Sequence, residues 1–185
     1  LILTFNLSLI NYIRDRISEV RETFPWSSFK ILNYHQFFLA NANNYVLPIT
    51  DLSVWDNQDF FEPVKSQIIK FQTIIIDEVQ DYKSGWLKII EKYFLAENGR
   101  YIVFGDEKQN IYTRSLDKEK FPVVPGIPGR WNTSLNINFR SSGKIVELAL
   151  NFQRQFLSQK YQIDKNMVSE PQLEIPYEHD KIHYY

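Results

Sequence analysis

The feature of this sequence that most constrains its fold is a short β-branched run, residues 73–76, followed at once by the acids Asp77 and Glu78. An unbroken apolar run of this length is typical of a strand buried on both faces of a parallel sheet. The pattern therefore predicts two acids at the carboxyl end of a buried strand. Acids are also favoured at the start of a helix, and the pair alone leaves that interpretation open.

A second strand is predicted soon afterwards in the sequence. Apolar residues recur at helical spacing between positions 87 and 95, and Asn98 with Gly99 is predicted to close that helix. The apolar run 101–104 then predicts a strand that ends at Gly105 and Asp106. Ligands of open parallel α/β sheets bind beyond the carboxyl ends of the strands, so we expect the polar residues at both strand ends to converge on one site.

The rest of the chain predicts further elements of an α/β protein. Strands are expected at residues 1–4, 29–32 and 131–137, and helices are expected after each of them. Residues 41–57 are predicted to form a loop, and residues 60–69 a short helix. We therefore expect a parallel sheet flanked by helices.

The acids after the first of these buried strands suit one kind of chemistry. Hydrolysis of a nucleoside triphosphate needs a carboxylate for the metal and a second group that orients or deprotonates the attacking water. Asp77 suits the first task and Glu78 the second.

Two segments resemble motifs of the UvrD/Rep-type superfamily 1 DNA helicases. Residues 77–81, Asp-Glu-Val-Gln-Asp, resemble their Walker B motif, and residues 104–112, Phe-Gly-Asp-Glu-Lys-Gln-Asn-Ile-Tyr, resemble their motif III. The resemblance implies that Asp77 holds Mg²⁺ through water, that Glu78 is the catalytic base and that Gln109 senses the γ-phosphate of ATP. It also implies that Tyr112 stacks on a base of single-stranded DNA, a contact worth about 1 to 3 kcal/mol.

Residues near the amino terminus carry a weaker resemblance. Residues 3–6 resemble motif Ia, which implies that Thr4, Phe5 and Asn6 lie along the DNA strand. His35 stands where the family has the histidine of a Thr-Phe-His element near the DNA path. A packed or solvated histidine is the alternative interpretation.

The resemblance continues after motif III with one departure. The family places an aromatic residue two positions after the motif III tyrosine, whereas this chain has Arg114, which we expect to reach a phosphate or to lie flat on a base. Residues 135–142 resemble motif IV and imply that Arg140 contacts the γ-phosphate from the hinge between two motor domains. A surface arginine before a helix is the alternative for Arg140.

The implied fold is the parallel sheet of a RecA-like P-loop NTPase, without the P-loop segment. The only Gly-Lys pair, Gly143-Lys144, is followed by Ile145 rather than by a hydroxyl residue, so it is not a P-loop. We expect the chain to be an excerpt of a longer polypeptide that is inactive alone. Residues 1–137 are predicted to form part of the first motor domain with a reduced accessory subdomain, and residues 138–185 the hinge and the start of the second.

Composition sets few further limits. The formal charge of −1 gives no general basic footprint for nucleic acid, and 44% hydrophobic residues are ample for a core. The chain lacks cysteine and any apolar run near the roughly 20 residues needed to cross a bilayer. A cytoplasmic protein without membrane association is expected.

Two functions follow from these patterns. The first is part of an ATP-dependent DNA helicase or translocase, which uses ATP and Mg²⁺ to move on single-stranded DNA, with protein partners in a repair or defence complex. The alternative is a catalytically inactive helicase-like module that serves as a docking platform for nucleic acid or protein. The departure at Arg114 and the short accessory region favour the platform, whereas Asp77, Glu78, Gln109 and Arg140 together favour the motor.

Overall fold

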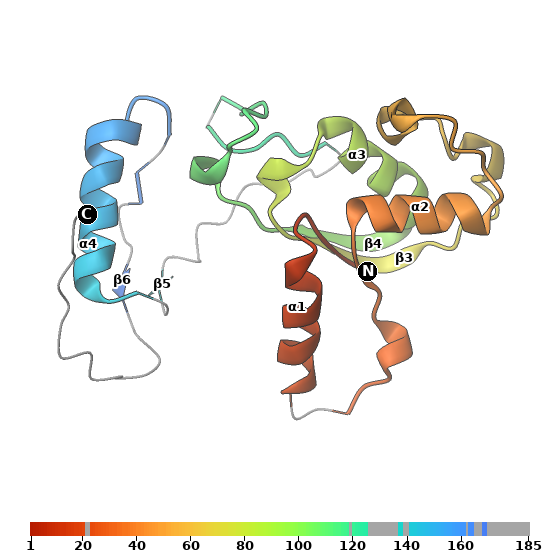
Figure 1. Cartoon of the computed structure of the whole chain (residues 1–185), viewed down its shortest axis with the longest axis horizontal. Helices are drawn as coiled ribbons and strands as arrows, with labels where there is room; N and C mark the ends of the chain where they lie inside the picture. Colours follow the sequence, from red (N-terminus) through yellow and green to blue (C-terminus); the bar gives the residue numbers. More distant parts are fainter. Residues whose placement is uncertain are drawn as a thin grey trace. The chain divides into compact units, whose positions relative to one another are not determined.

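The structure is a computed structural model of the 185-residue chain. It describes residues 1–20, 23–118, 120–125, 137–138, 141–161, 163–164 and 168–169. The chain divides into two compact units, Leu1–Pro128 and Gly129–Tyr185. The described parts of the first unit run from red to green in Figure 1, and those of the second are blue.

The first unit is built on a four-stranded, all-parallel sheet with the strand order β2-β1-β3-β4. Leu3 pairs with Ile76 across β1 and β3, and Ile75 pairs with Ile102 across β3 and β4. The strand predicted before Asp77 is present, but only one of its faces is fully buried: Ile74 and Ile76 are buried, whereas Thr73 and Ile75 on the other face are half-buried. The strands are β1 (Ile2–Thr4), β2 (Ile31–Asn33), β3 (Phe71–Ile76) and β4 (Leu95–Val103).

Helices connect successive strands, as a parallel sheet requires. Asn33 is the N-cap of α2, and its side-chain oxygen accepts the N–H of Gln36 at 2.8 Å. The helices are α1 (Ser8–Ser18), α2 (Tyr34–Asn44) and α3 (Ser84–Ile89), which continues as the π-helical turn η5 (Ile90–Phe94). Short 3₁₀ turns are η1 (Trp26–Ser28), η2 (Leu52–Asp56), η3 (Glu62–Val64), η4 (Val79–Asp81) and η6 (Glu107–Gln109).

An aromatic cluster joins α2, the segment before β3 and η5. Phe61 has no exposed surface, and its ring centroid lies 4.9 Å from that of Phe38 and 5.1 Å from that of Phe94. Phe37 meets Phe94 edge-on at 4.7 Å. Such ring pairs add to the free energy gained from burial of their area. The cluster thus packs α2 against the segment before β3 and against η5, the continuation of α3.

Three local predictions were wrong. The helix after Glu78 ends at Phe94, and Asn98 with Gly99 lies in an irregular part of β4, where the register with β3 shifts. Residues 60–69 form only the single 3₁₀ turn η3, which contains Pro63. Part of the expected loop 41–57 is helical, because α2 runs on to Asn44, whereas the turn η2 beyond it fits a loop region with one irregular turn.

The described residues of the second unit form one helix and a short parallel strand pair. Val146 and Tyr161 are its buried apolar side chains among the residues described. The helix predicted after the strand at 131–137 is present, although its apolar side chains Ile145, Leu148, Phe152 and Phe156 are exposed. The elements are β5 (Ile137–Asn138), α4 (Gly143–Phe152), its π-helical continuation η7 (Gln153–Leu157) and β6 (Val168–Ser169).

Candidate functional site

A cleft of about 810 Å³ lies at the carboxyl edge of the sheet. Because β1, β3 and β4 are parallel neighbours, the residues that follow each of them reach the same edge. Segments widely separated in sequence therefore meet there. The cleft is lined by Phe5, Asn6, Leu7, Leu9, Asn33, His35, Glu78, Gln80, Asp81, Lys108, Gln109, Ile111 and Tyr112.

Asp77 and Glu78 form a constrained turn at the end of β3. The N–H of Asp77 still donates to the carbonyl oxygen of Leu3 at 2.9 Å, so the turn starts from the sheet itself. Asp77 Oδ1 accepts the N–H of Glu78 at 3.0 Å. Glu78 has a φ of 54°, a left-handed conformation that is uncommon for glutamate. Backbone strain of this kind clusters at functional sites, so the turn is a candidate for one.

Asp77 is half-buried and does not line the cleft directly. Burial raises the pKa of its carboxyl group, and the neighbouring charge of Glu78 raises it further. Burial and the charge of Glu78 also raise the pKa of Asp81, while Arg114 opposes that rise. A group of three or more histidine, cysteine or carboxylate side chains placed to hold a metal does not occur in the described part of the chain.

Gln80 connects Glu78 to the end of β4. Its side chain is 1% exposed, and its Nε2 donates to Glu78 Oε2 at 2.6 Å. Its Oε1 accepts the N–H of Asp106 at 3.0 Å. Sequence reasoning did not assign Gln80 a role. Its presence inside the run 77–81 was the only signal, because burial of a glutamine cannot be read from periodicity.

Gln109 is attached to the same network through Asp106. Asp106 caps η6, where its Oδ1 accepts the N–H of Lys108 at 2.9 Å and its Oδ2 accepts Nε2 of Gln109 at 2.9 Å. The structure therefore brings Glu78 and Gln109 to one cleft and joins them through Gln80 and Asp106. Sequence reasoning did not foresee this connection.

Part of the lining of the cleft is an aromatic wall formed by Phe5 and Tyr112. The rings of Phe5 and Tyr112 lie 5.6 Å apart, and the guanidinium of Arg114 lies 5.3 Å from the centre of the Tyr112 ring. Tyr112 and its neighbour Ile111 are 46% and 77% exposed. Cation–π contact of this kind favours a flat arginine against the ring. The three side chains make an aromatic surface with an accessible ring.

Hydrogen bonds hold the backbone of Arg114 in place and, in part, its side chain. Asn110 Oδ1 accepts the N–H of Arg114 at 2.7 Å, and Asn110 Nδ2 donates to the Arg114 carbonyl oxygen at 2.8 Å. Two buried atoms nearby, Arg114 Nε and Asp81 Oδ1, have no hydrogen-bond partner within the ranges described. Buried polar atoms without a partner are uncommon, so these two atoms stand out beside the cleft that Asp81 lines.

The other predicted nucleic-acid residues differ in accessibility. Thr4 is fully buried, and its hydroxyl donates to the carbonyl oxygen of Asn6 at 2.9 Å, so it shapes the turn and has no surface for a ligand. Asn6 is exposed, and its Oδ1 accepts the N–H of Ser8 at the start of α1. His35 lines the cleft and is exposed, and its ring lies 5.0 Å from that of Trp55 and 4.9 Å from that of Trp86, roughly perpendicular to both. Burial lowers its pKa, and Lys83 lowers it further.

Arg140 lies outside the described residues, as do all but the last residue of the strand predicted at 131–137. The predicted contact of Arg140 with a phosphate therefore stays a prediction.

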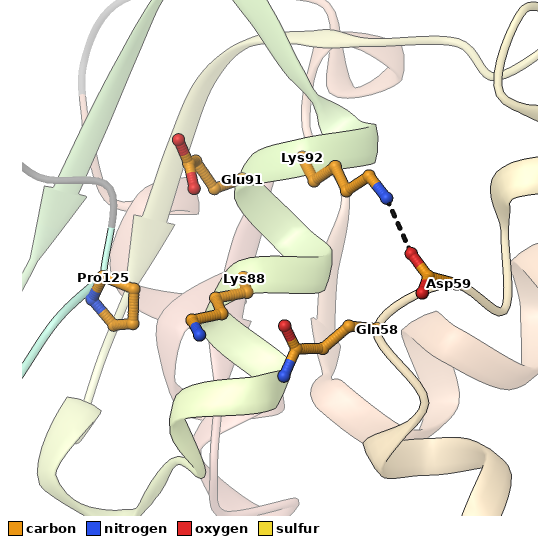
Figure 2. Close-up of a pocket in the computed structure, with 6 residues that line it drawn as sticks. All are labelled: Gln58, Asp59, Lys88, Glu91, Lys92 and Pro125. Carbon is orange, nitrogen blue, oxygen red and sulfur yellow. Dashed lines mark hydrogen bonds and ion pairs between the residues drawn. The ribbon is translucent and has the colours of Figure 1, made fainter.

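A second hollow of about 460 Å³ lies along α3 and η5, away from this cleft. Figure 2 shows Lys88, Glu91 and Lys92 on that helix, with Asp59 to one side of it and Pro125 to the other, and Gln58 also lines the hollow. Lys92 pairs with Asp59 at 2.9 Å and with Glu62 at 2.7 Å. These paired charges hold the segment before β3 against the helix, and none of the predicted site residues lines the hollow.

The fold and cleft define the class of this chain: an α/β protein whose all-parallel sheet carries polar side chains at its carboxyl edge. Comparison with protein-family models, curated proteins and solved structures gives no significant match. No helix in the described ranges has both the length and the apolar character required to cross a membrane.

Proposed function

We propose that this chain is part of the first, RecA-like motor domain of an ATP-dependent DNA helicase or translocase of the UvrD/Rep type. One observation carries the proposal. Glu78 and Gln109 come from the ends of two different strands, and they meet at one cleft through the chain of contacts from Glu78 to Gln80, Asp106 and Gln109. Positioned groups beside a cleft at the strand ends are what phosphoryl transfer to water requires.

The carboxylates at the end of β3 divide the chemistry between them. Glu78 lines the cleft and is the candidate base that takes a proton from the attacking water. Mg²⁺ binds proteins through one or two carboxylates plus water and phosphate oxygens, and Asp77, which does not line the cleft itself, would hold it through water. The metal would neutralise charge on the phosphates. Gln109, whose amide is held by Asp106, would donate to the γ-phosphate.

The aromatic wall would supply the DNA-binding part of the proposed activity. Tyr112 is accessible beside Phe5 and Arg114, and a base that stacks there would gain about 1 to 3 kcal/mol without regard to its identity. Gln109 and Tyr112 line the same cleft, and only two residues separate them in the sequence. A change at the phosphate-sensing residue therefore has a short path to the strand-binding surface.

Arg140 completes the proposed motor as a contact to the γ-phosphate, and the motor also requires a phosphate-binding loop, which residues 1–185 do not contain. The test is ATP hydrolysis by the polypeptide that contains both, with and without single-stranded DNA. We expect stimulation by DNA in the wild type and loss of turnover in Glu78→Gln. Glu97→Gln, at an exposed glutamate of β4, is the matched control and should retain the wild-type rate. Undiminished turnover in Glu78→Gln would refute the assigned role.

A docking platform without hydrolysis is the second candidate. Exposed apolar side chains beside the cleft, Phe104 at 43% and Ile111 at 77%, favour it, because such a surface suits a partner. A platform would bind single-stranded DNA or protein equally well with and without ATP, and Glu78→Gln would leave that binding unchanged. A motor would instead lose its ATP-dependent change in DNA affinity.

A further inference from the structure

The amide of Gln80 uses both of its polar atoms inside the protein. Nε2 donates to Glu78 Oε2 at 2.6 Å, and Oε1 accepts the N–H of Asp106 at 3.0 Å. A backbone N–H can only donate, so the oxygen of the amide must face Asp106 and the NH₂ group must face Glu78. The orientation of the amide is therefore fixed by chemistry.

The side chain of Gln80 is buried and tightly packed. It is 1% exposed, and Gly105 lies so close that a Cβ there would meet Gln80 Oε1 at 2.9 Å. The N–H of Val79 donates to the carbonyl oxygen of Phe104 at 2.9 Å and ties the two strand ends together beside it. A short hydrogen bond to a carboxylate from such a rigid donor restricts where that carboxylate can lie.

We propose that Gln80 is the positioning residue for the Glu78 carboxylate and couples it to the end of β4. The inference rests on the proposed function, since it gives Glu78 its role. Gln80 does not touch the reacting atoms. It holds the base at a fixed point while Asp106, its other partner, holds Gln109 at 2.9 Å. One buried amide thus sets the spacing between the base and the phosphate-sensing group.

The kinetic test compares Gln80→Leu with two controls in the ATP-hydrolysing polypeptide. Leucine nearly keeps the volume and removes both hydrogen bonds, so kcat should fall about tenfold or more while KM for ATP stays within about twofold. Tyr93→Phe removes the bond from a buried hydroxyl to Glu62 and controls for lost stability away from the cleft. Gln72→Leu makes the same chemical change at an exposed position of β3. Both controls should keep the wild-type kcat.

A direct test uses the 185-residue chain and needs no activity. In ¹H–¹⁵N NMR spectra, the side-chain NH₂ signal of Gln80 should shift in Glu78→Ala, because its carboxylate acceptor is gone, and stay in place in Glu97→Ala. An unmoved signal in Glu78→Ala overturns the inference. A kcat of Gln80→Leu equal to that of Tyr93→Phe overturns it as well, and leaves the proposed function standing. Absence of hydrolysis in the wild type overturns the proposed function, and with it the catalytic role of Gln80.

Discussion

Gly105 lies so close to Gln80 that a methyl group on its Cα would come within 2.9 Å of the side-chain oxygen of Gln80. The same methyl group would meet Val79 Cγ1 at 2.7 Å. A glycine is therefore needed here for close approach, because any side chain would separate the ends of β3 and β4.

Gly105→Ala should destabilise the first unit by about 1 to 3 kcal/mol, since overpacking forces the buried Gln80 out of place. Gly85→Ala is the matched control. A Cβ at Gly85 would lie 3.6 Å from its nearest neighbour, and alanine in α3 should raise the free energy of unfolding by up to about 1 kcal/mol. Urea denaturation of the two variants measures the difference. Equal stability of both would contradict the tight packing at Gly105.

Asp77→Asn should stabilise the protein at neutral pH. The pKa of Asp77 is raised above its ordinary 3.8, mainly by burial, so the folded state holds the proton more tightly than the unfolded state. The stability that this proton gives is complete below pH 3.8 and is lost as the pH rises through the raised pKa. Asparagine never carries the charge, and its Oδ1 can still accept the N–H of Glu78.

Free energies of unfolding between pH 4 and pH 7 test the sign of this effect. The advantage of Asp77→Asn should shrink as the pH falls. Asp51→Asn is a control of opposite sign, because hydrogen bonds from Ser53 lower the pKa of Asp51. Its charged form is the favoured one, so Asp51→Asn should be less stable than the wild type by nearly the same amount throughout pH 4 to 7, and should recover only below pH 3.8. An advantage of Asp77→Asn that does not depend on pH would contradict the buried-charge explanation.

Tyr112→Ala should weaken binding of a single-stranded oligonucleotide by about 1 to 3 kcal/mol, whereas Tyr112→Phe should bind like the wild type, because the ring supplies the contact. Tyr12→Ala on α1 is the matched control. Tyr12 is 56% exposed, and an arginine lies over its ring, as at Tyr112, but it is not part of the cleft. Fluorescence anisotropy of a labelled oligonucleotide measures the affinities. An equal loss in both alanine variants would point to general surface effects.

Asp56→Ala should cost more stability than Asp56→Asn. The buried Trp86 indole N–H donates to Asp56 Oδ1 at 2.7 Å, and alanine leaves this donor unpaired, at a cost of about 1 to 3 kcal/mol. Asparagine keeps an acceptor there and loses only the exposed ion pair with Lys83, worth at most about 1 kcal/mol. Thermal unfolding separates the two. An identical loss would mean that the charge, rather than the indole bond, is what matters.

Local sequence patterns predicted the secondary structure correctly where a segment's structure depended mainly on its own residues. The β-branched run before Asp77 formed the strand that it predicted, with one face fully buried and the other half-buried, and the strand at residues 1–4 lies beside it. Asn98 and Gly99 did not end a helix, because pairing with β3 drew Leu95 and the residues after it into β4. Pairing between strands is a long-range interaction that helical spacing cannot report.

The sequence by itself determined an α/β chain with acids at the end of a buried strand, since strand runs and turn residues act over a few neighbours. Only the tertiary structure decided that β3 and β4 are adjacent, that Gln80 is buried between their ends, and that Thr4 is covered while Tyr112 is open. The physical reason is that burial and hydrogen-bond partners depend on segments far apart in the chain, which only packing of the sheet and its helices brings together.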